Sequence, residues 1–120
     1  MIKNVWFETA DTPVVENLLT VDASSGESGA DVMVLGGTFF NVSDEIITLD
    51  LFITTDPSAE TATKEENIFL GNIEVDPDDA WIWTYDFRKS LQFGAKLWIK
   101  ISSETPGKRM VVQLDYDVMV

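Results

Sequence analysis

The clearest pattern in the chain is the alternation of apolar and polar positions over residues 110–120. Apolar side chains occupy the even-numbered positions, and the residues between them include Gln113, Asp115 and Asp117. Successive side chains of a strand point to opposite faces, so the pattern predicts a strand with one face in the core. Residues 97–102 alternate in the same way. Pro106-Gly107 between the two segments favours a type II turn, which predicts a C-terminal hairpin.

Further strands are predicted upstream by the same reasoning, at residues 2–7, 14–21, 32–42, 47–54, 67–75 and 81–87. Two turn signals separate some of them, namely Ser24 to Gly29 and Asp76-Pro77-Asp78-Asp79. Residues 56–66 are the one candidate helix, with Asp56 as its cap and Pro57 in its first turn, although a loop is favoured there. About eight strands at these spacings predict an all-β fold, an antiparallel β-sandwich resembling a jelly roll.

The length of 120 residues and the 45% hydrophobic content predict a single β-sandwich domain over residues 1–120. Residues 1–10 are expected to form either an N-terminal arm or an edge strand. No apolar run reaches the roughly 20 residues that span a bilayer, and the first residues lack the apolar run of a signal peptide. Synthesis in the cytoplasm is therefore expected.

The charge and the residue composition reduce the number of functions that fit the chain. The chain has 21 acidic and 8 basic residues, a net charge of −13, which makes nucleic acid and anionic membranes unlikely partners. Six of the bases lie within residues 88–109 and could form one less acidic face. His and Cys are absent, so the side chains that most often transfer protons or bind metals near neutral pH are missing. We therefore expect no enzyme, no catalytic residues, no cofactor and no metal.

Aromatic residues supply the first candidate binding surface. Trp81, Trp83, Tyr85 and Phe87 alternate along one predicted strand and would share a face. Trp81, Trp83 and Tyr85, together with Trp98, could form a platform that stacks on sugars, as in a carbohydrate- or receptor-binding module. Aromatic residues that share a strand face are more often core or oligomer interface, and both alternatives stay open.

The N-terminal segment supplies the second candidate. Ile2, Trp6 and Phe7 could belong to an arm that adds a strand to a sister subunit or to a larger shell. Alternatively, the segment is an ordinary first strand that packs Trp6 and Phe7 in the core of its own domain.

Three polar groups of residues also suggest chemistry. Asp76, Asp78 and Asp79 could hold Ca²⁺, but a solvated turn is favoured because the Gly and the distal Glu of a calcium loop are missing. Asp115 and Asp117 could in principle act in glycoside hydrolysis, and outward solvation is the ordinary alternative. The sequence Asn41-Val42-Ser43 matches a glycosylation acceptor, but a turn is favoured.

The order of strands and turns from Gly36 to Val120 resembles the small β-sandwich virion proteins of tailed bacteriophages. The segments that carry the resemblance are Gly37-Thr38-Phe39-Phe40-Asn41-Val42-Ser43-Asp44, then Glu45 to Thr55, then Ile68 to Val75, and then Leu91-Gln92-Phe93-Gly94-Ala95-Lys96-Leu97. The chain departs from that pattern at Pro77-Asp78-Asp79, where a turn containing Gly would be usual, and in its heavier aromatic run.

The resemblance implies a capsid decoration or cement protein on the outer surface of the virion, with neck and tail components as related possibilities. It implies a homo-oligomer, with a trimer favoured, that binds the major capsid protein and is made in the host cytoplasm. The side chains expected to contact such partners are Ile2, Trp6, Phe7, Trp81, Trp83 and Trp98.

Overall fold

The computed structural model describes residues 2–22 and 29–119. Met1, Val120 and residues 23–28, which include most of the predicted turn at Ser24 to Gly29, lie outside the described residues. Nine strands form two sheets. Sheet A consists of β1 (Ile2–Glu8), β9 (Met110–Met119), β3 (Asp31–Asn41) and β6 (Ala80–Trp83), in that order, with β7 (Lys89–Leu91) also paired to β3. Sheet B consists of β2 (Val14–Thr20), β8 (Lys96–Ser103), β4 (Ile47–Thr54) and β5 (Ile68–Val75).

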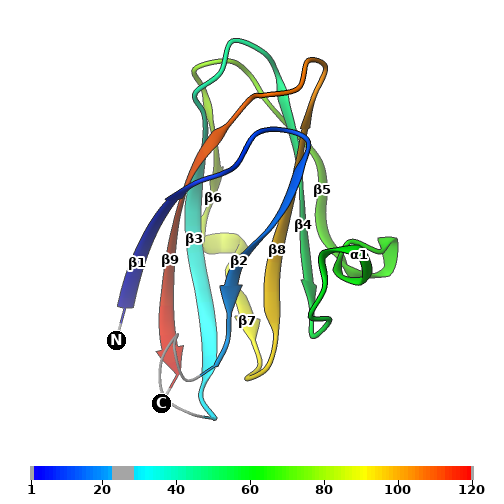
Figure 1. Cartoon of the computed structure of the whole chain (residues 1–120). Helices are drawn as coiled ribbons and strands as arrows, with labels where there is room; N and C mark the ends of the chain where they lie inside the picture. Colours follow the sequence, from blue (N-terminus) through cyan, green and yellow to red (C-terminus); the bar gives the residue numbers. More distant parts are fainter. Residues whose placement is uncertain (1, 23–28, 120) are drawn as a thin grey trace.

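Every strand pair in both sheets is antiparallel, and most connections cross from one sheet to the other (Figure 1). The orders β1-β9-β3-β6 and β2-β8-β4-β5 are those of a jelly roll, in which two four-stranded sheets face each other. Because β6 and β7 both pair with β3, they share one strand position, which leaves eight positions in the sandwich. The predicted all-β, jelly-roll-like sandwich is confirmed.

The single strand predicted over residues 81–87 is wrong. β6 ends at Trp83, and residues Tyr85–Phe87 form a 3₁₀ turn, η2. The indole nitrogen of Trp83 donates to the carbonyl of Phe87 at 2.8 Å, and the amide of Phe87 donates to the carbonyl of Thr84 at 3.0 Å. These bonds turn the chain out of the strand direction before it returns as β7. The four aromatic residues therefore do not share one face.

The core lies between the inner faces of the sheets and follows the period of two. In β9 the even-numbered side chains are buried. In β8 the buried inner set is Leu97, Ile99 and Ile101. Aromatic rings close the side of the sandwich between β6 and β5. Trp83 packs on Phe69 with ring centres 5.4 Å apart, and Trp81 packs on Phe39 at 5.2 Å. The contact of Trp83 with Phe69 joins the two sheets, whereas Trp81 and Phe39 both belong to sheet A.

The segment between β4 and β5 contains a one-turn helix, α1 (Ala59–Ala62), and a 3₁₀ turn, η1 (Glu65–Asn67). Ser58, not the predicted Asp56, caps α1 by accepting a hydrogen bond from the amide of Thr61. The segment projects from the edge of sheet B and covers Phe52 and Trp98 on its outer face (Figure 1). In the described ranges no helix has the length and apolar character needed to cross a membrane.

Asn41 joins three segments at one end of the sandwich. Its buried amide group donates to the carbonyls of Glu45 at 2.7 Å and Val75 at 2.9 Å, and its Oδ1 accepts from the amide and hydroxyl of Ser43. Its backbone bonds to the turn at Asp78 and Asp79. The Asn41-Val42-Ser43 sequence is thus a turn whose Asn side chain faces inward, and it offers no free amide for glycosylation.

Asn41→Ala should lower the free energy of unfolding by about 2–4 kcal/mol, because it removes the hydrogen bonds to the carbonyls of Glu45 and Val75 and the acceptor of the Ser43 amide. Urea unfolding followed by circular dichroism measures the change. Asn4→Ala is the matched control, since Asn4 is exposed and its side chain makes one hydrogen bond, so about 1 kcal/mol or less is expected. Equal losses in the two variants would contradict this role of Asn41.

Candidate functional site

The outer face of sheet A carries exposed apolar side chains. The strand registers place Trp6, Gln113, Thr38 and Ile82 in one row across β1, β9, β3 and β6. Trp6 is 68% exposed and Ile82 is 52% exposed, and Ile2, two rows from Trp6, is 67% exposed. Because the inner faces already fill the core, these side chains are not needed for it. A cluster of exposed large apolar residues on one face is typical of an interaction surface.

A groove of about 530 Å³ lies on this face, between β1 and the chain that follows β6. Its lining includes Ile2, Ile82 and Tyr85, and among its polar residues are Gln113 and Asp115. The ring of Tyr85 is 60% exposed at one border. This volume falls within the range of small-molecule sites, although the groove is open and shallow.

A bulge in β3 creates the floor of the groove. The register with β9 shifts between Val34 and Gly36, so Leu35 is the extra residue. Gly36 has φ 152°, and a Cβ there would lie 2.3 Å from the backbone oxygen of Trp83. A Cβ on Gly37 would lie 2.3 Å from the backbone oxygen of Gln113. Only glycine lets the strands approach so closely, and the absence of side chains leaves the sheet surface hollow.

Asp115 is held in a fixed orientation beside this floor. Its Oδ1 accepts hydrogen bonds from the side-chain amides of Asn4 at 2.5 Å and Gln113 at 2.8 Å. Among the described residues no hydrogen bond reaches its Oδ2, so this oxygen can accept a hydroxyl or N–H group of a ligand. Asp117 shares the outer face but does not line the groove. The groove therefore presents one oriented acceptor beside apolar walls, without the second carboxylate that glycoside hydrolysis needs.

The structure separates the residues that the sequence suggested as partner contacts. Ile2 and Trp6 are exposed on sheet A, whereas Phe7 points inward and is partly buried. Trp81 packs partly buried against the core, and Trp83 is only 2% exposed. Trp83 has almost no exposed surface for a partner, whereas the contacts expected from the partly buried Phe7 and Trp81 stay predictions.

Trp98 lies on the other sheet, 8% exposed beneath α1, and its indole N–H has no hydrogen-bond partner among the described residues. The predicted sugar platform of Trp81, Trp83, Tyr85 and Trp98 does not exist. Sequence reasoning missed Ile82, which stands between two tryptophans. Assigning both tryptophans to the core would have placed Ile82 outward by the period of two.

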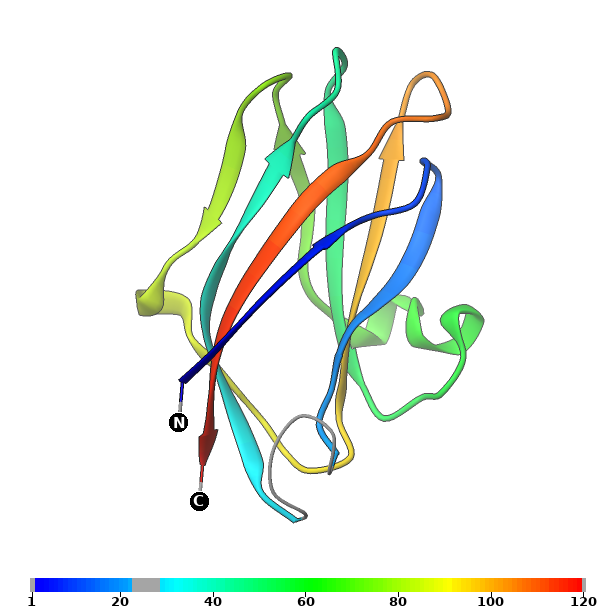
Figure 2. The same cartoon turned by 60° about the vertical axis from the view of Figure 1, so that its left-hand side comes forward.

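The N-terminal segment is an ordinary strand of its own domain. β1 pairs with β9 over its whole length, from Ile2 opposite Asp117 to Glu8 opposite Val111. Of the two outcomes left open by the sequence, the first-strand alternative is confirmed in its pairing, but only Phe7 of the expected pair packs inward. Trp6 points outward from β1, and β1 forms the border of sheet A (Figure 2).

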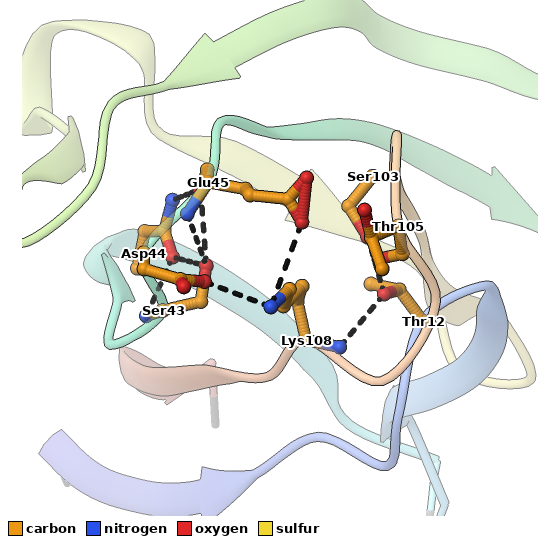
Figure 3. A network of polar contacts seen from close by, with 8 residues as sticks. Thr12, Ser43, Asp44, Glu45, Ser103, Thr105 and Lys108 are labelled. Atoms are coloured by element: carbon orange, nitrogen blue, oxygen red, sulfur yellow. Dashed lines mark hydrogen bonds and ion pairs between the residues drawn. The ribbon is translucent and has the colours of Figure 1, made fainter.

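A second polar cluster (Figure 3) links the turns at the end of the sandwich opposite the start of β1 and the end of β9 (Figure 1). The ammonium group of Lys108 lies 2.8 Å from Asp44 and 3.5 Å from the buried Oε2 of Glu45. The amide of Lys108 donates to the hydroxyl of Thr12 at 3.0 Å, and that hydroxyl lies 2.5 Å from the hydroxyl of Ser103. The hydrogen bond with Lys108 lowers the pKa of Asp44 and raises the pKa of Lys108. These contacts hold together the connections between β1 and β2, between β3 and β4, and between β8 and β9.

The basic residues of the second half do not form the single face that their spacing suggested. Arg109 pairs with Glu8 and Asp11 beside the Lys108 cluster. The other four lie elsewhere: Lys96 and Lys100 are on β8, and Arg88 and Lys89 follow η2. Across residues 2–22 and 29–119 no three His, Cys, Asp or Glu side chains are grouped so as to hold a metal. Asp76 to Asp79 form a turn in which Asp79 Oδ1 accepts the amide of Ala80 at 2.8 Å.

No family model and no curated protein matches the chain. Among solved structures, a chain of the T13 particle of IBDV, described in connection with the evolution of icosahedral viruses, superimposes with a TM-score of 0.47 and 11% sequence identity. The alignment covers 100% of this chain and 36% of the viral chain, so this chain spans about a third of its length.

The Lys108 cluster predicts a defined pH dependence of stability. A carboxylate whose pKa is lower in the folded than in the unfolded chain stabilises the fold above its unfolded pKa, and this contribution is lost as the pH falls through the folded pKa. Between about pH 5 and pH 3 the urea midpoint should therefore fall further for the wild type than for Asp44→Asn. Asp86→Asn changes an exposed carboxylate that has no ion pair in the described part of the chain, and it should retain the wild-type loss. The same acid response in wild type and Asp44→Asn would contradict the assignment.

Proposed function

We propose that the protein is a non-enzymatic structural component of a virion, a decoration or cement protein that binds copies of itself and the major capsid protein on the outer capsid surface. The observation that carries this proposal is the set of exposed apolar side chains on the outer face of sheet A, represented by Ile2, Trp6 and Ile82, on a fold whose core is already filled. Several large apolar side chains exposed on one face are typical of a surface that is covered in a complex.

Burial of this face would supply the free energy of attachment. Fully burying a large apolar side chain contributes roughly 1.5–3 kcal/mol, and several on one face can hold a small protein on a larger surface. The groove at Gly36 can receive a projecting side chain, and Asp115 can accept a hydrogen bond from it. When many copies bind only the assembled shell, their binding energies add to the stability of that shell.

Charge and resemblance support the location on the outer surface. A chain with a net charge of −13 is repelled by packaged nucleic acid, and repulsion among neighbouring copies is screened by salt in the surrounding solution. The similarity of residues 36–120 to small virion proteins of tailed phages points to the same place. The jelly roll occurs in viral capsid and lectin domains alike, so the fold alone does not select between these functions.

Carbohydrate binding is the second candidate, and the groove favours it in place of the missing tryptophan platform. Sugars are bound by an aromatic ring against the C–H face and by fixed polar groups for the hydroxyls. Tyr85 is 60% exposed, with the guanidinium of Arg88 4.5 Å from the centre of one ring face, and Asp115 offers an oxygen oriented by Asn4 and Gln113. The net negative charge favours a neutral sugar over an acidic one.

The decoration proposal predicts that the purified protein binds empty capsids from which the native copies of this protein have been removed. Binding should raise the melting temperature of these capsids. Ile82→Glu should weaken binding at least about tenfold by placing a charge in the buried face. Ile68→Glu, the same change at an exposed site on β5 of sheet B, should bind as the wild type does. Co-sedimentation measures both. Absence of wild-type binding, or equal binding by both variants, would refute the proposed face.

The carbohydrate candidate predicts binding of a neutral glycan on an array, confirmed by calorimetry. Tyr85→Ala and Asp115→Asn should each reduce that binding more than about tenfold while the circular dichroism stays unchanged. Trp98→Phe, on the opposite sheet, is the control and should bind normally. An array with no bound glycan eliminates this candidate.

A further inference from the structure

The jelly roll leaves four strand positions at sheet edges, and three of them are modified in ways that hinder pairing with another chain. β5 has two register shifts against β4, and Asn72 within it has φ 56°. β2 has a shift between Asn17 and Leu19. The β6–β7 edge is broken by η2 into strands of 4 and 3 residues. Bulges and short strands of this kind are the usual protection against edge-to-edge association.

β1 lacks this protection. Its 7 residues pair with β9 without a register shift, and they include neither Pro nor Gly. The strand forms the outer border of sheet A, with no strand beyond it (Figure 1). A straight, regular edge strand is a template for pairing with another strand.

The free hydrogen-bonding groups of β1 follow from its register. The amide of Thr9 donates to the carbonyl of Met110 at 2.9 Å, so this pair is a hydrogen-bonded one. Such pairs recur at every second residue of an antiparallel ladder. The backbone amides and carbonyls of Lys3, Val5 and Phe7 therefore bond to β9. The amides and carbonyls of Ile2, Asn4, Trp6 and Glu8 therefore face the free edge. None of the described residues bonds to them.

We propose that β1 pairs antiparallel with β1 of a second copy of the chain. This inference rests on the proposed function, because it specifies how copies of the protein associate. The register that uses all four free residues sets Ile2 opposite Glu8 and Asn4 opposite Trp6 of the second copy. Val5 then lies opposite its own counterpart on the two-fold axis, in a pair without hydrogen bonds.

The charge of β1 favours a second copy as the occupant. Two chains of charge −13 repel each other, so a self-contact needs a segment without net charge. β1 contains Lys3 and Glu8 and is neutral, so two paired β1 strands bring no net charge into the contact, although these two side chains point to opposite faces of the sheet. Trp6 adds apolar contact, because the two Trp6 side chains become diagonal neighbours on the outer face.

The two-fold axis of such a pair is perpendicular to the sheet, so sheet A continues across both copies. Their outer faces then point to the same side and form one surface with two grooves. Such a dimer would dock on a lattice through two linked sites, which increases its avidity. The two-fold contact closes at two copies, whereas the phage resemblance implies a trimer.

Single-cysteine variants test the register directly, because the chain has no native cysteine. Val5→Cys should form a disulfide-linked dimer under mild oxidation, since directly opposed residues of this class have Cα atoms about 4.5 Å apart. Lys3→Cys lies on the same strand face but opposite Phe7 of the second copy, so it should cross-link far less. Equal cross-linking of both variants, or none in a folded Val5→Cys protein, would overturn the proposal.

Sedimentation of the cysteine-free protein gives a second, independent measurement. The wild type should dimerise with rising concentration, and Trp6→Glu should raise the dissociation constant at least about tenfold by bringing two carboxylates together. Ile82→Glu lies on the same sheet face but at the far edge, and it should dimerise normally. A wild-type protein that stays monomeric at all concentrations yet binds capsids would overturn β1 pairing and leave the proposed function standing. A dimer of the stated register that does not bind capsids would support β1 pairing and contradict the proposed function.

Discussion

The pairing of β3 with β9 is the interaction on which the rest of the structure depends. It runs from Asp31 opposite Met119 to Asn41 opposite Met110, and it occupies the centre of sheet A. β9 carries β1 on its other side, and β3 carries both β6 and β7. The register of this one pair therefore determines which side chains face the core and which face solvent. A slip of β3 by one residue against β9 would turn the core side chains of β3 to the solvent face.

The central pair also explains why the candidate surface is where it is. The bulge at Leu35 gives β3 an extra residue, so the pairs on its two sides differ in register by one residue while β3 stays paired with β9 along both parts. Past the bulge, Gly36 and Gly37 allow the backbones of β6 and β9 to come close. The same local adjustment brings Ile82 and Tyr85 to the border of the groove and places Asp115 beside its floor. The packing and the candidate site thus share one cause.

The sequence predicts the fold well because alternation is a local signal. The strands at residues 47–54 and 110–119, and the positive φ at Gly107, follow from residue types and spacing alone. The predicted C-terminal hairpin is wrong, because β8 pairs with β2 and β4 in sheet B whereas β9 pairs with β1 and β3 in sheet A. Sequence reasoning fails where a long-range or specific contact overrides the pattern. The hydrogen bond from Trp83 to the carbonyl of Phe87 ends β6 early, although the alternation continues through Phe87.

The site was predicted less completely for a related reason. Exposure and burial of an aromatic residue depend on which strand lies opposite, and one sequence does not contain that information. Trp6 and Trp83 both belong to strands, yet one is at the surface and the other is in the core. The acceptor at Asp115 depends on an amide from Asn4, more than a hundred residues away in the chain. Only the strand order places these residues together.

The two glycines of β3 have a consequence for how the protein can change over generations. Each is required because backbone atoms of a neighbouring strand occupy the space that a side chain would need. Selection for a foldable chain is therefore enough to maintain the hollow above them, whether or not anything binds there. Descendants are free to alter the rim around a cavity that they inherit, and this makes the hollow a durable starting point for new specificities.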